Sequence, residues 1–261
     1  MEVNKISFSE LKVWKECAYK HKLSYKDKIP HFLGNEYTAF GTAVHLVCEE
    51  ILLDRAKIKK AEEIFTSSFN EEIDSLIEKK VPLREKLLAE LQSQFLKIYP
   101  DILPSIDNYF GPFEVISQEE EILEDIKEFD SKNKKFKGFI DLVIKTEDDK
   151  YHVIDWKTCS WGWNSKKKSD PMTTYQLIYY KNYFSKKHNI DPENIEVHFA
   201  LLKRTAKQNH VEFFRTSSGQ KKINNSLKLL ENAVINIEKE NFIKNRLSCR
   251  NCAFYKTEHC T

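Results

Sequence analysis

The chain has 261 residues, of which 41% are hydrophobic and 31% are charged. These proportions exclude a disordered or collagen-like protein, and no apolar run approaches the ~20 residues that a membrane-spanning helix needs. Its 42 basic and 40 acidic residues give a formal net charge of +2, so overall charge does not indicate a nucleic-acid-binding protein. The start of the chain lacks the apolar core of a signal peptide, and we therefore expect a cytoplasmic protein.

The first part of the chain has the pattern of helices. Apolar residues at helical spacing predict a short helix that a serine caps, Ser7 or Ser9, and a longer helix over residues 36–53. Residues 55–110 continue as polar-rich helical segments, which we interpret as a helical insertion. Prolines cannot donate a backbone hydrogen bond, so we expect breaks at Pro82, Pro100 and Pro104.

The periodicity then changes to that of strands. Alternating or short apolar runs predict three strands, and the last two are joined by the turn TEDDK at residues 146–150. A helix, one or two further strands and a last amphipathic helix follow before a cysteine-rich tail. This order predicts a single α/β domain over residues 1–261, with a mixed β-sheet flanked by helices, the insertion at 55–110 and the tail at 245–261.

Two carboxylates and a lysine fall at the ends of the central predicted strands. Asp155 and Lys157 are two residues apart, so their side chains share a strand face. Asp141 reaches the same place if the two strands pair through the turn. Neighbouring carboxylates favour a hard cation such as Mg²⁺ or Mn²⁺, and a lysine beside it can orient water or offset charge on a phosphoryl group. Glu119 and Glu121 share another strand face and could join the site, although solvated carboxylates are the simpler interpretation.

Several segments, in order, resemble the PD-(D/E)XK nuclease superfamily and its RecB-like exonuclease branch. That branch includes the CRISPR-associated iron–sulfur nucleases and the AddB-type helicase–nucleases. The segments are SFSELKVWKECAYKHKLSYKDKI (7–29), FGTAVHLVCEEIL (40–52), GFIDLVI (138–144), VIDWKT (153–158) and YQLIYYKNYF (175–184). The resemblance implies a restriction-endonuclease-like fold and a Mg²⁺- or Mn²⁺-dependent deoxyribonuclease of a bacterial, archaeal or phage-infected cell. Helicase, recombination or CRISPR-adaptation proteins would be its partners.

The resemblance also assigns roles to individual residues. Asp141 and Asp155 would bind the metal with His45 and the Trp156 backbone carbonyl, and Lys157 would be the catalytic lysine. Gln176 and Tyr180, one helical turn apart, would contact substrate or brace the site, although packing roles are equally compatible with their positions. The implied activity is exonucleolytic, on single-stranded or frayed DNA ends. The alternatives are an endonuclease of the same fold, a catalytically idle DNA-binding or scaffold subunit, and a zinc-stabilised nucleic-acid-binding protein.

Three of the six cysteines, Cys249, Cys252 and Cys260, fall in the tail. A metal centre of this kind needs a fourth ligand, and the resemblance nominates Cys17, which implies a [4Fe–4S] cluster that clamps the amino-terminal helix to the tail. His259 beside Cys260 keeps zinc open as the alternative. Cys48 and Cys159 are expected to be free thiols.

Aromatic and cationic residues follow the predicted strand that carries Lys157. Exposed aromatics beside lysines suit stacking on unpaired bases and contacts with phosphates. The alternative is a charged surface loop with one tryptophan tucked inward. The predicted nucleic-acid-binding residues are Trp161, Trp163, Lys166, Lys167, Lys203 and Arg204.

Overall fold

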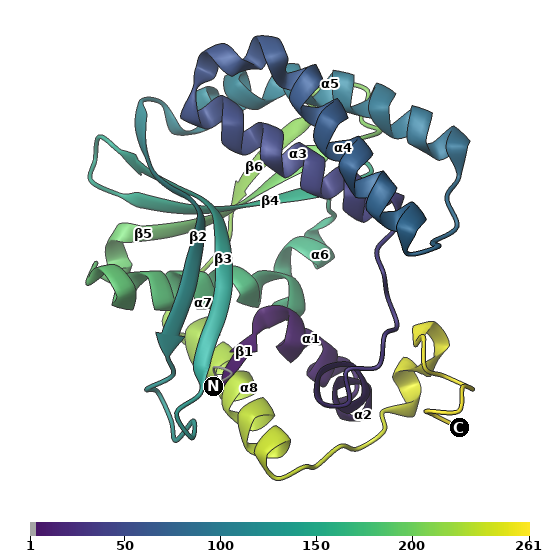
Figure 1. Cartoon of the computed structure of the whole chain (residues 1–261). Coiled ribbons are helices and arrows are strands. Elements are labelled where there is room, and N and C mark those ends of the chain that lie inside the picture. The colour runs from purple at the N-terminus through teal and green to yellow at the C-terminus, as the bar shows by residue number, and fades with distance from the viewer. Residues whose placement is uncertain (1–3) are drawn as a thin grey trace.

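The structure is a computed structural model that describes residues 4–261. One mixed sheet of six strands lies between two groups of helices (Figure 1). This arrangement confirms the predicted α/β architecture. The strands are β1 (Lys5–Ser7), β2 (Phe113–Asp125), β3 (Lys135–Thr146), β4 (Tyr151–Cys159), β5 (Ile195–Lys203) and β6 (Val211–Arg215).

The helices occupy the segments between and around these strands. Short turns of 3-10 or π-helix accompany them, and one of these turns, at residues 246–251, begins the cysteine-rich tail. The α-helices are α1 (Phe8–Glu16), α2 (Ala18–His21), α3 (Glu36–Leu53), α4 (Ala61–Glu78), α5 (Glu85–Phe110), α6 (Ser165–Ser169), α7 (Pro171–His188) and α8 (Gln220–Glu238).

The sheet is built around the long strand β3. Strand β2 pairs with one edge of β3 over nearly its whole length. On the other edge, β1 pairs in parallel with the first residues of β3, and β4 pairs antiparallel with residues 142–145. Beyond β4 come β5, which is parallel to it, and β6. On this edge, residues 138–141 of β3 therefore lie between the segment that pairs with β1 and the segment that pairs with β4.

Two hydrophobic cores hold the helices against the sheet. Helices α3, α4 and α5 bury apolar side chains on one face, and α1, α7 and α8 do so on the other. Helix α3 begins at a capping box in which the Asn35 side chain accepts hydrogen bonds from the backbone N–H groups of Tyr37 and Thr38. Its buried residues, which include Ala43, Val47 and Ile51, recur every four positions as the sequence predicts.

The prediction of helix breaks at Pro100 and Pro104 was wrong. Helix α5 continues through both prolines to Phe110. Each internal proline costs about 3 kcal/mol, whereas fully burying one large apolar side chain gains about 1.5–3 kcal/mol. Five such side chains offset the prolines, namely Leu91, Phe95, Ile98, Ile102 and Ile106, all of which are buried.

Strand β1 was not predicted, because its three residues are too few to show a period. Among residues 4–261, no helix combines the length and the apolar character needed to span a membrane.

Candidate active site and cysteine site

Strands β3 and β4 form a fork. Their last regular pair joins Leu142 to Ile154, and the next residues along each strand are Asp141 and Asp155. Here the Asp141 carboxylate accepts a hydrogen bond from the Trp156 N–H, with an Oδ2–N distance of 2.7 Å. A side chain thus replaces the ladder partner that a backbone carbonyl would provide, and the fork brings both aspartates to one site.

Asp155 and Lys157 form an ion pair on one face of β4, with Lys157 Nζ 2.5 Å from Asp155 Oδ2. Asp155 is 1% exposed, whereas 33% of the Lys157 side chain is exposed. Burial raises the pKa of Asp155 to about 6 against the opposing ammonium of Lys157, and the charge of Asp141 adds to the rise. Burial by itself would lower the pKa of Lys157, but the two carboxylates outweigh it and raise that pKa. Lys157 is therefore a charged, partly accessible group at neutral pH.

His45 reaches this site from α3. Its Nδ1 lies 3.8 Å from Asp141 Oδ2. Burial and the Lys157 ammonium together lower the pKa of His45 to about 4, while the Asp155 charge and a hydrogen bond to the Trp156 backbone oppose the shift. The imidazole is therefore neutral at neutral pH, which leaves a nitrogen lone pair for a metal ion.

Glu119 lies on β2, the strand next to β3, at the level of Asp141. The residue pairs Gln118–Leu142 and Glu120–Ile140 flank these two residues in the β2–β3 ladder. Its backbone φ is +45°, a left-handed conformation that is uncommon for a non-glycine residue and is often found at functional sites. Ligand atoms of His45, Glu119 and Asp141 lie within 4.8 Å of one another. Glu121, in contrast, pairs with Lys137 at 3.0 Å. Of the two glutamates considered from the sequence, the structure brings Glu119, and not Glu121, to Asp141 and His45.

The donor set at the fork fits a hard divalent cation. Burial raises the pKa of Asp141 to about 6 and also raises the pKa of Glu119. The three carboxylates of Asp141, Asp155 and Glu119 exceed the single ammonium of Lys157 by two negative charges, which one divalent cation neutralises. Carboxylate oxygens are the ligands that Mg²⁺ prefers, and Mn²⁺ accepts both oxygen and imidazole ligands.

Helix α7 places Gln176 and Tyr180 beside the fork. Gln176 Nε2 donates a hydrogen bond to the Tyr180 hydroxyl at 3.0 Å. Tyr180 is 5% exposed, and burial raises its pKa, with a further rise from the charge of Asp155. Its ring packs on Gly138 of β3, where an added Cβ would lie 2.6 Å from Tyr180 Cε1. Gly138 is therefore needed for this close approach.

Replacing Gly138 by alanine should displace the Tyr180 ring and lower the free energy of unfolding by about 1–3 kcal/mol, the usual cost of overpacking. Gly41→Ala is the matched control, because an added Cβ there meets nothing closer than 3.7 Å and alanine favours a helix by about 0.5–1 kcal/mol. Urea unfolding measures both variants. Equal stability of the two would contradict this account of the contact.

The two tryptophans predicted to bind nucleic acid lie in different environments in the segment after β4. Trp161 is 77% exposed. The Trp163 ring packs against Phe199 and Phe214, at centroid distances of 5.0 and 6.0 Å. Lys167 Nζ lies 4.5 Å from the centroid of the same Trp163 ring. Trp161 is thus available for stacking on a base, whereas Trp163 fills a packing position.

The predicted cationic residues also differ in accessibility. Lys166 is exposed. Lys203 is buried and its Nζ lies 3.2 Å from Glu212 Oε2. The guanidinium of Arg204 lies 4.6 Å from the ring centroid of Tyr37. Lys166 therefore remains free to approach a phosphate, while Lys203 is held in an ion pair.

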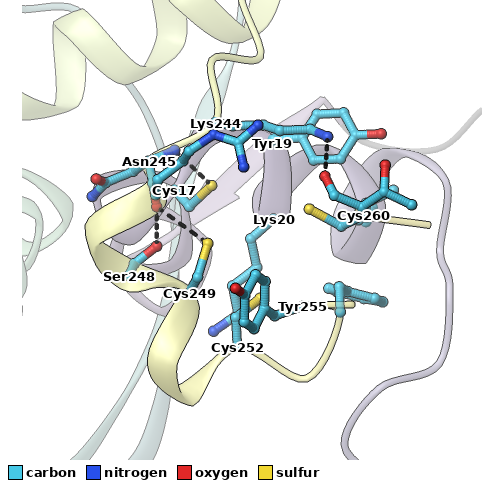
Figure 2. A pocket seen from close by; sticks show the side chains of 14 residues that line it. Cys17, Tyr19, Lys20, Lys244, Asn245, Ser248, Cys249, Cys252, Tyr255 and Cys260 are labelled. Carbon is cyan, nitrogen blue, oxygen red and sulfur yellow. Dashed lines mark hydrogen bonds between the residues drawn. The ribbon is translucent and has the colours of Figure 1, made fainter. Parts of the chain in front are cut away.

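The four cysteines of the predicted cluster line one pocket, and in Figure 2 their sulfur atoms point into the same space. Cys17 lies between α1 and α2, and the tail packs beside it. The Asn245 N–H donates to Cys17 Sγ at 3.3 Å, and the Tyr19 hydroxyl donates to the His259 carbonyl at 3.2 Å. Residues far apart in the sequence are therefore joined at this pocket. The four cysteines are Cys17, Cys249, Cys252 and Cys260.

The separation of the sulfur atoms bears on what the pocket can hold. Thiolates around one zinc ion lie about 3.8 Å apart, because Zn–S bonds are about 2.3 Å long and tetrahedral. Within the described part of the chain, no cysteine belongs to a group of three or more ligand atoms that all lie within 4.8 Å of one another. The His259 side chain is not among the pocket-lining groups. The sulfur ligands that line this pocket are the four thiols.

Similar proteins indicate the family and the fold of this chain. A family model described as the PD-(D/E)XK nuclease superfamily matches residues 5–257. A solved structure named "Putative exonuclease" from Eubacterium rectale is 10% identical, with a TM-score of 0.57 over 97% of this chain and 88% of that chain, and shows a shared fold. A structure named SSO0001 is 15% identical, with a TM-score of 0.44 over 97% of this chain and 85% of that chain. A search of curated proteins gives no match.

Proposed function

Because the chain belongs to the PD-(D/E)XK nuclease superfamily, we propose that it is a Mg²⁺- or Mn²⁺-dependent deoxyribonuclease that hydrolyses phosphodiester bonds. The observation that supports this most strongly is the arrangement of Asp141, Asp155 and Lys157 at the fork of β3 and β4. The family places two acidic residues and a lysine at such a site. Their burial, charge balance and proximity suit metal-assisted hydrolysis.

Each residue has a distinct part in the proposed reaction. Asp141, Asp155, His45 and the Trp156 carbonyl would hold the metal ion, and Glu119 would join them. The bound ion would lower the pKa of its water and offset negative charge on the phosphate. The Lys157 ammonium, fixed by its ion pair with Asp155, would orient the water or donate to a phosphoryl oxygen.

Gln176 and Tyr180 would act as positioning residues in this proposal. Their mutual hydrogen bond and the burial of Tyr180 beside the aspartates favour a role in bracing the fork. The amide oxygen of Gln176 remains free to contact substrate. Both roles remain predictions, since the same contacts also serve packing.

The pH dependence of metal binding follows from the raised pKa values of Asp141 and Asp155, which are both about 6. Bound metal requires both carboxylates without their protons, so we expect affinity for Mn²⁺ to fall by about 100-fold between pH 7 and pH 5. His45, with its pKa lowered to about 4, adds little in this range. Calorimetric titration of the protein with Mn²⁺ at each pH measures the effect.

The folding stability of the metal-free protein has the opposite pH dependence. A carboxyl with a raised folded-state pKa destabilises the fold above that pKa, so its contribution improves as pH falls through 6 toward the unfolded value near 4. Asp141→Asn removes one titrating group and should weaken the pH dependence of metal binding. An affinity for Mn²⁺ that is equal at pH 7 and pH 5 would contradict the proposed ligands.

The proposed substrate is single-stranded DNA or a frayed DNA end, bound in part by Trp161 and Lys166. Trp161→Ala should weaken binding to single-stranded DNA by about 5- to 150-fold, because stacking on an aromatic ring contributes about 1–3 kcal/mol per base. Trp163→Phe, which keeps the packing against Phe199, is the control. Fluorescence anisotropy measures both variants with single-stranded and duplex DNA. Equal weakening on both DNAs, or none, would contradict the stacking role.

A [4Fe–4S] cluster on the four cysteines is the proposed cofactor, with zinc as the alternative. The convergence of the four cysteines on one pocket and the N–H donor at Cys17 support the cluster. Lys20, Lys244 and Arg246 also line the pocket and can offset the charge of four thiolates. Bound there, the cluster would fasten the tail to the amino-terminal helices.

Digestion of end-labelled linear and covalently circular single-stranded DNA with Mg²⁺, Mn²⁺ or EDTA tests the proposed activity. Metal-dependent loss of the linear DNA alone would support an exonuclease, and cleavage of the circle would identify an endonuclease. Absence of cleavage by cluster-loaded protein in any metal would contradict the proposal and favour a DNA-binding or scaffold subunit. The partners from recombination or CRISPR adaptation and the cytoplasmic location remain predictions.

A further inference from the structure

A second group of metal-ligating side chains lies on β4 and β5, away from the fork. His152 of β4 is the parallel neighbour of Glu196 in β5, and His198 follows two residues later on the same sheet face. Their face is covered by the end of α5, where the Phe110 ring lies 4.9 Å from the His152 ring. His152 and Asp155 are three residues apart, so they lie roughly 10 Å from each other and point to opposite faces.

Three ligand atoms in this group converge on one point. The distance between His152 Nδ1 and His198 Nε2 is 3.1 Å. Glu196 Oε2 lies 3.9 Å from the first of these nitrogens and 3.7 Å from the second. Ligand atoms on one face of a zinc tetrahedron lie about 3.4 Å apart, because Zn–N and Zn–O bonds are about 2.0–2.2 Å long. The observed triangle has the size of such a face.

The hydrogen bonds around His152 leave its Nδ1 without a proton. The Thr146 hydroxyl donates to Asp148 Oδ1 at 2.5 Å, so the Thr146 oxygen is an acceptor for His152 Nε2–H at 2.9 Å. The neutral ring carries one proton, and it is at Nε2. Metal-bound histidines commonly donate their other N–H in this way, which fixes the ring orientation.

Glu196 and His198 are held in a similar manner. Glu196 Oε1 accepts from Arg215 Nη1 at 2.8 Å, which leaves Oε2 directed at the two rings. The Tyr109 hydroxyl lies 3.5 Å from His198 Nδ1. Burial lowers the pKa of His198 to about 3 and also lowers the pKa of His152, so both rings are neutral at neutral pH.

We propose that His152 Nδ1, His198 Nε2 and Glu196 Oε2 bind a zinc ion, with water as the fourth ligand. Two imidazoles and one carboxylate suit zinc, whereas the fork offers mainly oxygen ligands, which suit a harder cation. The three ligand residues line an open cavity of about 520 Å³, which has room for this water and which Lys150 and Arg215 also line. This zinc ion ties β4 to β5 and is independent of the proposed nuclease activity.

Titration with zinc chloride tests the site in cluster-loaded protein with excess Mg²⁺. Calorimetry and elemental analysis should show that His198→Gln and Glu196→Gln each bind one zinc equivalent fewer than wild type. The affinity of this site should fall by at least about 100-fold, the upper end of the effect of losing an outer-shell partner. His188→Gln is the matched control, because His188 also contacts a carboxylate, that of Glu120, but belongs to no metal-ligating group among residues 4–261.

Thermal unfolding and a variant of the hydrogen-bond partner of His152 test the site independently. Zinc should raise the melting temperature of wild type more than that of Glu196→Gln, and Thr146→Val should weaken zinc binding by about 10- to 100-fold. If His198→Gln does not fold, as judged by circular dichroism, these two variants decide. Equal zinc uptake by wild type and Glu196→Gln would overturn the site and leave a direct hydrogen bond between the two histidine rings as the explanation of their contact.

Discussion

Lys157→Ala is expected to lower the rate of metal-dependent DNA cleavage by about 100- to 1000-fold, the usual effect of removing one group that stabilises transition-state charge. The Lys157 ammonium lies 2.5 Å from Asp155 and is the cation of the fork that reaches the surface. Its removal takes away the group that would orient water or contact the phosphate. Initial rates on end-labelled single-stranded DNA with Mn²⁺ measure the loss.

Controls separate this loss from misfolding. Without Lys157, the buried Asp155 loses its partner and should take up a proton, since its pKa is already raised to about 6. Asp155→Asn combined with Lys157→Met should therefore fold normally and remain inactive. Lys145→Ala removes an ion pair with Asp149 and a contact with the Tyr151 ring, neither of which involves a residue of the fork, and should keep full activity. A Lys157→Ala rate within twofold of wild type would contradict the assigned role.

Cys17→Ala is expected to abolish iron binding and to lower the melting temperature by about 10–20 °C. A centre that joins Cys17 to the tail closes a loop through almost the whole chain, and in the chain-entropy estimate such a cross-link contributes about 5 kcal/mol. A protein of this size loses about 2–4 °C per kcal/mol. Iron analysis, visible absorption and thermal unfolding of anaerobically purified protein measure the change.

Cys159→Ala is the control for this prediction. Cys159 is a free, half-exposed thiol on β4 and lies outside the cysteine pocket, so its loss should leave iron content and melting temperature unchanged. Wild-type protein that carries zinc and no iron would identify the alternative metal. Wild-type protein with neither metal, or equal stability of Cys17→Ala and wild type, would contradict a metal-linked clamp.

Local patterns predicted most of the fold because most elements bury a regular stripe. The three predicted strands correspond to β2, β3 and β4, and the four-residue repeat of α3 recurs in its buried residues. Helix α5 shows the limit of local rules, since the breaking effect of Pro100 and Pro104 was outweighed by packing that only the fold creates. Strand β1 is defined by its pairing with β3 and not by its own sequence.

In the site, too, some features follow from local sequence patterns and others depend on strand pairing. The i, i+2 spacing correctly placed Asp155 beside Lys157 on one strand face. The position of Glu119 depends on its left-handed backbone and on the β2–β3 register, which no sequence pattern revealed. His152 and His198 meet only because β4 and β5 pair in parallel, so their contact was not predicted. The presence of one histidine in each of two apolar predicted strands is the signal that could have suggested it.

Anomalous diffraction at the manganese edge, from crystals soaked in Mn²⁺, tests the central proposal most directly. We expect a peak within coordination distance of carboxylate oxygens of both Asp141 and Asp155, and its loss in Asp155→Asn. Cleavage-competent protein whose manganese lies elsewhere, with neither aspartate as a ligand, would contradict the assignment of the β3–β4 fork as the active site.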